Sequence, residues 1–499
     1  MDGALEPRNG LSGRGPGMAG LLSLSWRLNG DSYDVAMVAS RLVARGVPVW
    51  WCTRASDGGE AGDYLVDGSR VPAGVFDRLG LRVRPWPGAH QPDHALSLSA
   101  ARVALLGGQV SAYPYFGFAA LTLVRLGLPY RLVDGQSIAR GDLRDVNFFV
   151  LPGGFSTWGL DRGEAAPGAD AETRAFLDRG GVCIGSCGGA NYLSMGRPGW
   201  TGTAAAYPRF PHEYLYSGVG VITLKIEDEL FGIGLPPTID LPYYHGPIYE
   251  EWGPGVKSLA RFHEHSFAGR LFIDNPLERS FFDREMRGRA AILAADGPRG
   301  RAILFSPHPE MGDLVRKYMA LDGYVRHYLP IRGKRVMEET LAFYRSTDAP
   351  SFRLFLNASR MLMSKPLPEP GPFHADGRGA KDLGKRIDDL RQGVTAALRD
   401  IGQHIGTSDH DELVRGVIAD LDRRAAVIPA LASALQEPAV GRELAEEWRN
   451  IATLALPELT GEPTRNHKVP HRLMNVELVI SMAEAWKRLA EVELALARA

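Results

Sequence analysis

The chain reads Val182-Cys183-Ile184-Gly185-Ser186-Cys187-Gly188-Gly189 at the point that decides its fold. The apolar run predicts a buried strand, and the segment after it, residues 190–195, has the pattern of a helix. A nucleophile on a sharp strand-to-helix turn needs small neighbours, because its own backbone is strained and its flanks approach closely. The start of the helix would also favour a thiolate. The stretch therefore predicts either a reactive Cys187 or a tight glycine turn in which this cysteine only packs.

Further short apolar runs surround this segment. They are typical of strands and alternate with helical patterns, one of which passes through Phe118, Leu121 and Val124. This alternation predicts right-handed crossovers and an α/β fold whose parallel sheet is covered by helices on both faces. Ligands bind such sheets beyond the carboxyl ends of the strands. The predicted strands are Val103–Leu106, Tyr130–Val133, Phe148–Leu151, Val182–Ile184 and Ala302–Leu304.

A histidine and a glutamate follow the last of these strands, in Ser306-Pro307-His308-Pro309-Glu310. A cysteine nucleophile needs a base, and the base needs a carboxylate that orients it. Glu310 lies two residues beyond His308, close enough to hold one tautomer of the imidazole. The alternative is a satisfied histidine in a proline-rich turn.

A double glycine, Gly153-Gly154, follows the strand that ends at Leu151. Exposed amides at such a position can donate hydrogen bonds to a developing oxyanion, together with the amide of Gly188. We therefore expect an oxyanion hole formed by Gly153, Gly154 and Gly188.

These three segments resemble the class I glutamine amidotransferase superfamily, with its Gly-x-Cys-x-Gly elbow and its His-Pro-Glu end. Within it, the chain most resembles the biotin-protein ligase N-terminal-like branch. That resemblance rests on Cys187-Gly188-Gly189-Ala190 with Tyr192, and on Tyr243-Tyr244-His245-Gly246-Pro247. It covers residues 100–330 and implies a flavodoxin-like sheet, a Cys187–His308–Glu310 triad and amide or thioester chemistry.

The chain departs from the family patterns beside the nucleophile. Typical glutamine amidotransferases carry a glutamine shortly after the cysteine, where this chain has Ala190 and Asn191. The intracellular-protease-like branch carries a histidine directly after the cysteine, where this chain has Gly188. The resemblance therefore leaves the amide substrate open. We expect Tyr244, His245 and Asn191 to contact it, although an aromatic-capped loop would explain the two aromatic residues equally well.

Four regions are predicted along the chain: a disordered lead (1–20), a small α/β module (21–99), the amidotransferase-like domain (100–333) and a helical domain (334–499). In the module, a helix (35–44) precedes a strand (47–51). The last region should form a small helical bundle, with helical patterns at 413–435, kinked by Pro429, and at 474–496. Its clearest amphipathic stripe consists of Leu383, Ile387, Leu390, Val394, Leu398, Ile401 and Ile405.

The bulk composition is that of a soluble globular protein, with 45% hydrophobic residues, 23% charged residues and a formal net charge of −1. It predicts no nucleic-acid or membrane partner. Three cysteines are too few for a disulfide framework, so we expect a cytoplasmic protein. His263-Glu264-His265 offers two imidazoles without a clear third ligand, so no metal is expected. No nucleotide-binding motif is present, and no cofactor is expected.

These patterns favour a cysteine-dependent hydrolase or an acyl- or amide-transfer enzyme that acts on a small-molecule or peptide amide or ester. Two alternatives remain: a non-catalytic binding or scaffold protein that retains the fold, and a subunit that delivers ammonia to a separate synthetase. The C-terminal helices either cover the α/β domain or bind a protein partner.

Overall fold

The computed structural model describes residues 20–56, 58–88, 90–107, 115–153, 166–211, 217–265, 275–298, 300–326, 350–369, 383–406, 409–437, 440, 442–460 and 469–497. The expected lead lies outside these residues except for Gly20, and Gly154 of the expected oxyanion hole lies outside them as well.

Five parallel strands form one end of the large sheet, in the order β7-β6-β8-β9-β16, with β7 at its edge. Taken in chain order, this is the 2-1-3-4-5 arrangement of flavodoxin-like folds. The predicted α/β fold class is therefore confirmed. The strands are β6 (Val103–Leu106), β7 (Tyr130–Val133), β8 (Phe148–Leu151), β9 (Val182–Ser186) and β16 (Gly300–Phe305).

Helices cover both faces of these strands, and alternate side chains enter two separate cores. In β9, Val182 and Ile184 belong to the core shared with α4 (Tyr115–Arg125) and α12 (Pro350–Met363). Cys183 belongs to the other core, which includes residues of three further helices. These are α5 (Gly135–Ala139), α7 (Ala169–Asp178) and α8 (Gly188–Leu193).

An antiparallel extension, which the sequence patterns did not predict, continues the sheet beyond β16. It begins with the hairpin of β15 (Ala290–Gly297) and β16, and it proceeds through β14, β11 and β12. Residues far apart in sequence thus come to lie beside the parallel strands. The remaining elements here are β10 (Ala206–Pro208), β11 (Val219–Ile226), β12 (Thr238–Tyr244), β13 (Tyr249–Trp252), β14 (Val256–His265), α9 (Arg279–Phe281) and η3 (Phe282–Met286).

The N-terminal module has its own five-stranded sheet, in the order β4-β1-β3-β2-β5. The predicted helix and strand appear as α2 (Ser32–Ala44) and β2 (Val49–Cys52). Asp31 begins α2, because its carboxylate accepts hydrogen bonds from the backbone N–H groups of Tyr33 and Asp34. The other elements are β1 (Leu21–Leu24), α1 (Trp26–Asn29), β3 (Tyr64–Asp67), η1 (Gly68–Arg70), α3 (Val75–Arg78), β4 (Arg84–Pro85) and β5 (Ala95–Ser97).

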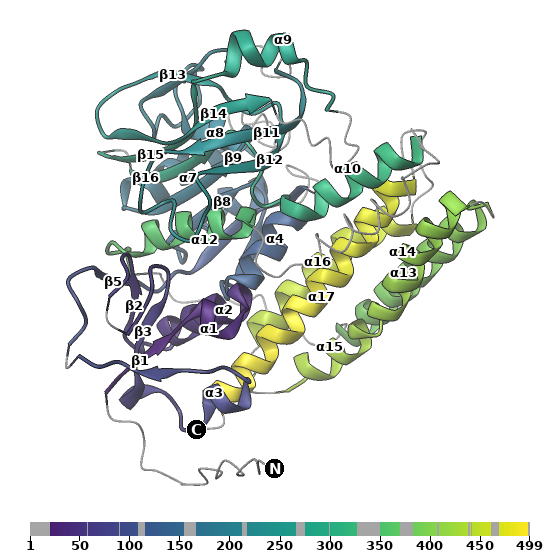
Figure 1. Ribbon diagram of the computed structural model, residues 1–499, viewed down its shortest axis with the longest axis horizontal. Helices are drawn as coiled ribbons and strands as arrows, with labels where there is room; N and C mark the ends of the chain where they lie inside the picture. Colours follow the sequence, from purple (N-terminus) through teal and green to yellow (C-terminus); the bar gives the residue numbers. More distant parts are fainter. Residues whose placement is uncertain are drawn as a thin grey trace, which may run out of the picture.

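The C-terminal region is helical, and its helices from residue 383 onward lie together on one side of the molecule, whereas α12 lies against the sheet (Figure 1). The predicted stripe falls in α13 (Leu383–Gln403), where six of its seven members, all but Ile405, are buried. The predicted kinked helix is instead two helices, α14 (Asp409–Arg424) and α15 (Val427–Leu435), because the break precedes Pro429 and leaves this proline in the first turn of α15. The region ends with α16 (Arg442–Thr460) and α17 (Val469–Ala497).

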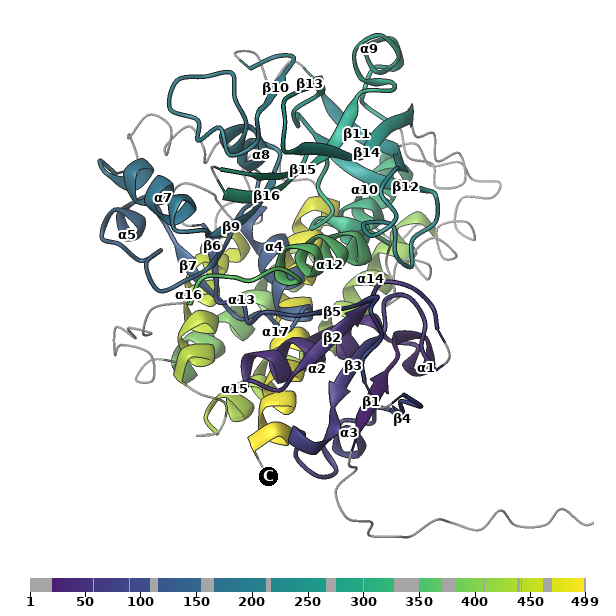
Figure 2. The same cartoon turned by 90° about the vertical axis from the view of Figure 1, so that its left-hand side faces the viewer.

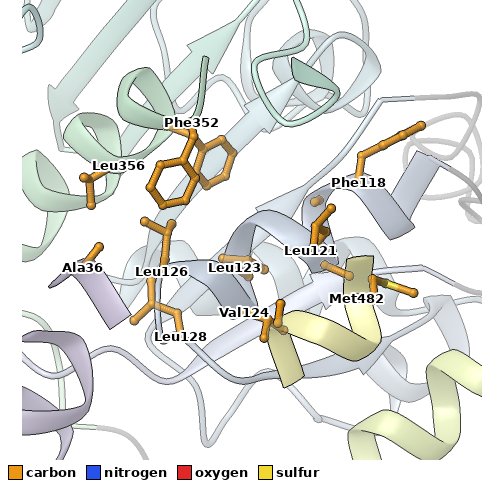
Figure 3. Packing of buried hydrophobic residues seen from close by; sticks show 14 of the residues in the cluster. Ala36, Phe118, Leu121, Leu123, Val124, Leu126, Leu128, Phe352, Leu356 and Met482 are labelled. Carbon is orange, nitrogen blue, oxygen red and sulfur yellow. The ribbon is translucent and has the colours of Figure 1, made fainter. Parts of the chain in front are cut away.

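The long helix α17 joins the three parts of the molecule. It packs against α4, against α2 and against α10 (Gly312–Arg326), and Figure 2 shows it passing behind the N-terminal module. In the shared core, Met482 of α17 lies beside Leu121 and Val124 of α4 (Figure 3). A single hydrophobic cluster thus runs from the N-terminal module through α4 and α12 into the C-terminal helices. Among the described helices, none combines the length and the apolar character needed to cross a membrane.

Candidate active site

Cys187 lies at the sharp turn between β9 and α8. Its backbone has φ 49° and ψ −110°, a conformation that is rare for a residue other than glycine. The Cys187 N–H donates to the Phe305 carbonyl at 2.8 Å, and its own carbonyl accepts from Asn191 N at 3.0 Å. The flanking glycines are required by space: a Cβ atom on Gly189 would lie 2.1 Å from the Leu151 carbonyl oxygen. The Cys187 side chain is therefore held in place by the fold.

His308 and Glu310 leave the neighbouring strand β16 at the same edge of the sheet. Glu310 Oε1 lies 2.7 Å from His308 Nδ1, and both side chains are 1% exposed. The other carboxylate oxygen, Oε2, accepts a hydrogen bond from Ser186 Oγ at 3.0 Å. The Glu310 carboxylate is thus fixed at both oxygens, which orients the imidazole with its Nε2 atom directed away from Glu310.

The protonation of His308 is controlled by its neighbours. Burial alone would lower the pKa of His308, but the Glu310 carboxylate and the Cys187 side chain raise it above its ordinary value of 6.5. In the observed state, Cys187 Sγ donates to the Tyr244 carbonyl oxygen at 3.0 Å. Among the described residues, His308 Nε2 then has no hydrogen-bond partner within normal geometry. The raised pKa makes the His308 imidazole a stronger base than an ordinary histidine, and it lies beside a thiol that is bonded to a carbonyl.

The first residue of the expected oxyanion hole, Gly153, lies directly beside the cysteine and the histidine. A Cβ atom at this position would come within 3.1 Å of Cys187 Cβ and 3.2 Å of His308 Nε2. Gly188 is the first residue of α8, immediately after the cysteine. The structure thus brings Gly153 and Gly188 to the thiol, while Gly154 lies outside the described residues.

The Tyr243–Pro247 segment reaches the site through its backbone. Tyr244 contacts the thiol with its carbonyl group, whereas its ring packs against Tyr115 and His245. His245 has φ 52°, and its Nδ1 accepts a hydrogen bond from Gly218 N at 3.0 Å. Because burial also lowers the pKa of His245, this ring is neutral near pH 7. A Cβ atom on Gly246 would lie 1.9 Å from the Ser306 carbonyl oxygen, so this turn packs tightly against the segment that carries His308.

Asn191 lies one helical turn after the cysteine, in α8. Its side chain is buried, and neither the amide nitrogen nor the amide oxygen has a hydrogen-bond partner among the described residues. A buried amide without partners is costly in a folded protein, and it is often completed by a bound molecule. Its position is compatible with the expected contact to a substrate.

The other two cysteines do not join this cluster. Burial raises the pKa of Cys52 to about 12, and burial also raises the pKa of Cys183. Cys183 belongs to the core on the α5, α7 and α8 side of the sheet. Both thiols are therefore protonated at neutral pH.

Two residues at the site had no predicted role. Ser186, which binds Glu310, precedes the nucleophile in the quoted stretch, and strand alternation could have placed it on the face opposite Gly185. Tyr115 begins α4 and lies near Cys187 and Tyr244; burial is the main reason why its pKa is raised. Only the fold, not a sequence motif, brings Tyr115 to this position.

The His263–Glu264–His265 segment ends strand β14. His265 is buried, and its Nε2 lies 2.7 Å from the Leu277 carbonyl oxygen. Within the described part of the chain, no group of three or more His, Cys, Asp or Glu side chains is arranged to hold a metal ion.

Comparison with known proteins shows no matching family model and no matching curated protein. Similar solved structures exist. One, a glutamine amidotransferase, is 22% identical over 42% of this chain and 90% of its own, with a TM-score of 0.28. Another, described as a GMP synthase subunit from Thermoplasma acidophilum, is 14% identical over 49% of this chain and 95% of its own, with a TM-score of 0.27. Similarities at these TM-scores say nothing about activity, which is therefore inferred from the strand order and the site geometry.

Proposed function

We propose that the protein is a cysteine-dependent hydrolase or an acyl- or amide-transfer enzyme, with Cys187 as its nucleophile. The observation that carries this proposal is the pairing of a strained cysteine turn with a buried His308–Glu310 pair on the adjacent parallel strand. Backbone strain of this kind costs on the order of 1–3 kcal/mol and is concentrated at functional sites. A tight turn that only packed a cysteine would not need a buried imidazole and carboxylate beside it.

The proposed reaction begins when the Cys187 thiol turns from the Tyr244 carbonyl to His308. The proton passes from Sγ to Nε2, and the resulting thiolate attacks the substrate carbonyl carbon. His308 then protonates the leaving amine or alcohol as the carbon–nitrogen or carbon–oxygen bond breaks, which leaves a thioester on Cys187. Water, or a second nucleophile in a transfer reaction, attacks the thioester and releases the thiol.

The remaining residues would position these groups. Glu310 holds the Nδ1 proton of His308, and Ser186 fixes the carboxylate in turn. The amides of Gly153 and Gly188 are proposed to stabilise the oxyanion, with Gly154 as a further candidate. Asn191 is proposed to bind a polar group of the substrate, because its buried amide has no partner in the described part of the chain. Tyr244 and His245 would form the wall of the pocket.

The finer assignments rest on sequence patterns. The similarity to the biotin-protein ligase N-terminal-like branch depends on the elbow after Cys187 and on the Tyr243–Pro247 turn, which contacts the thiol. We infer a small-molecule or peptide amide or ester as substrate, a cytoplasmic location, and four regions with boundaries at residues 20, 99 and 333.

The decisive experiment is mass spectrometry of the intact protein after incubation with candidate amides and esters. We expect a covalent increment equal to the acyl group in the wild-type protein and none in the Cys187→Ala variant. Cys52→Ala and Cys183→Ala serve as matched controls and should keep the increment, because both thiols are protonated at neutral pH. Equal labelling of all three cysteines by a thiol-directed electrophile would contradict the proposal.

A further inference from the structure

One cavity among the described residues is not lined by Cys187. It has a volume of about 460 Å³ and lies between the N-terminal module, the α/β sheet and the C-terminal helices, lined by residues of α2, α4, α10, α14 and α17. Figure 1 shows the meeting of α4, α10 and α17 around which it is built. Sites for small molecules commonly have volumes of about 300–1,000 Å³, so the cavity is large enough to hold one.

Many charged side chains line this cavity, and most of them are paired with one another. Arg488 binds Asp34, Lys317 binds Glu477, and Arg424 binds both Glu477 and Glu484. These pairs connect the helices that surround the cavity and leave little charge for a ligand. Most of the charged side chains that line the cavity therefore serve to join these helices.

Arg125 is an exception on the α4 side of the cavity. Its guanidinium group lies 4.5 Å from the centre of the Tyr33 ring, and its Nη1 lies 3.5 Å from the Tyr33 hydroxyl. It forms no ion pair with any carboxylate in the described part of the chain. Arg125 acts electrostatically on the nearby Asp313 carboxylate, but the ion pair of Asp313 is with Arg316, at 3.3 Å. A guanidinium group stacked on a ring and lacking a carboxylate partner is suited to bind an anionic group.

Asp31 is the matching exception on the N-terminal side. One of its oxygens, Oδ1, accepts two backbone N–H groups at the start of α2, at 2.7 and 3.2 Å. No described lysine, arginine or histidine forms an ion pair with it; burial raises the pKa of Asp31, and the charge of Arg488 acts in the opposite direction. Tyr33 lies next to both Asp31 and Arg125, since its N–H donates to the Asp31 carboxylate and its ring stacks on the Arg125 guanidinium group. Within the described residues, an acid and a base without ion-pair partners therefore line the same cavity.

We propose that this cavity binds a small zwitterion, with the carboxylate of the ligand on Arg125 and its ammonium group on Asp31. A molecule with only one charge would leave either Arg125 or Asp31 without a partner in a partly buried site. The site is distinct from the thiol: Glu310 also lines the cavity, but its carboxylate is fully used by His308 and Ser186. Binding can therefore be measured without any assumption about the proposed reaction.

The test is isothermal titration calorimetry of the full chain with three zwitterions of increasing length: glycine, 4-aminobutyrate and 6-aminohexanoate. Hexanoate and hexylammonium serve as probes that carry one charge each. The variants are Arg125→Met, which keeps most of the side-chain volume, and Asp31→Asn, which keeps a side chain able to begin α2. Arg279→Met and Asp388→Asn are matched controls at exposed positions away from the cavity.

We expect at least one zwitterion to bind saturably, and each cavity variant to weaken it about tenfold or more, because each removes a charge-assisted contact. The control variants should bind as the wild-type protein does. Thermal unfolding of each variant checks that it is folded. The proposal is overturned if no zwitterion binds, if hexanoate or hexylammonium binds as tightly as 6-aminohexanoate, or if binding survives in both folded cavity variants.

Discussion

Gly153 lies so close to His308 that a Cβ atom on this glycine would come within 2.3 Å of the imidazole Cε1 atom. The end of strand β8 therefore forms a wall against which the ring of the proposed base is held. His308 is fixed on its other side by the Glu310 carboxylate. The imidazole can neither turn nor withdraw while the backbone at residue 153 remains in place.

We predict that Gly153→Ala largely abolishes the reaction of Cys187 with iodoacetamide. The added methyl group must displace either the imidazole or the backbone after β8, because the neighbouring atoms belong to His308 and Cys187. Alkylation rates measured by mass spectrometry at neutral pH test this. Gly384→Ala is a suitable control, since nothing lies within 4 Å of its added methyl group. A variant that reacts as fast as the wild type would show that the imidazole does not need its observed position.

Ser186→Ala should slow the same alkylation by about fivefold, which corresponds to about 1 kcal/mol for one lost hydrogen bond. Without the Ser186 hydroxyl, Glu310 Oε2 loses its 3.0 Å hydrogen bond and orients His308 less firmly. The matched control is Ser306→Ala: this serine is also buried, but its hydroxyl has no partner among the described residues. An equal loss in both variants would mean that packing, rather than the Glu310 contact, is responsible.

Glu310→Gln should lower the pKa of His308, because the carboxylate is the main group that raises it against the effect of burial. The imidazolium exists below its pKa, so a lower pKa removes the positive charge from the alkaline side of the pH range. At pH 7 the thiolate then loses its stabilising neighbour, and alkylation of Cys187 slows. Rates recorded from pH 5 to 9 should show the fast reaction beginning at a higher pH in the variant than in the wild type, because a thiolate without a neighbouring cation forms at higher pH. An unchanged pH profile would argue against an ion pair of cysteine and histidine.

The sequence predicted the parallel strands closely, because their apolar runs have the short length of buried strands rather than the length of helices. It did not predict the antiparallel extension through β14 and β15, since that extension depends on pairings between distant segments. The break before Pro429 was also misplaced, because a proline is tolerated in the first turn of a helix, where its missing N–H would have no partner.

At the candidate site, too, contacts between distant segments could not be predicted from the sequence. The spacing of His308 and Glu310 indicated their contact, since two residues on one short turn can hardly be far apart. The Tyr244 carbonyl on the thiol could not be foreseen, because it depends on the unusual backbone of His245 and on the close packing of Gly246 against Ser306. Local patterns therefore identified chemical groups, whereas long-range packing determined their neighbours.

Glu477→Gln should destabilise the protein by about 3–5 kcal/mol at pH 7, because it leaves the buried Lys317 and the partly buried Arg424 without their shared partner. Although burial acts in the opposite direction, these two cations lower the pKa of Glu477 to about 2, from 4.5. Its stabilising effect is thus complete above pH 4.5 and is lost as the pH falls toward 2.

Urea unfolding of both proteins should accordingly give a constant stability difference from pH 7 to about 5, and a smaller difference at lower pH. Glu491→Gln, in the same helix, is the matched control. Its partners Lys487 and Arg488 are both partly exposed, so the expected loss is at most about 1 kcal/mol. If the two variants lose the same stability, the buried network does not hold α17 to α10.

A chain that ends at Pro368, and so lacks α13 to α17, should fail to fold as a soluble monomer. Removing α17 uncovers the apolar surface of α4 that Met482 and its neighbours bury (Figure 3). Each large aliphatic or aromatic side chain left exposed loses about 1.5–3 kcal/mol of burial free energy. A few such residues together lose as much as the whole stability of a typical domain. Co-expression with the separate segment 383–497 should restore solubility, because the same surfaces can meet between two chains.

Gel filtration of the shortened protein decides the question. A monomeric product with cooperative unfolding would show that the helices form an independent unit, and their burial against α4 would then contribute little to the stability of the sheet.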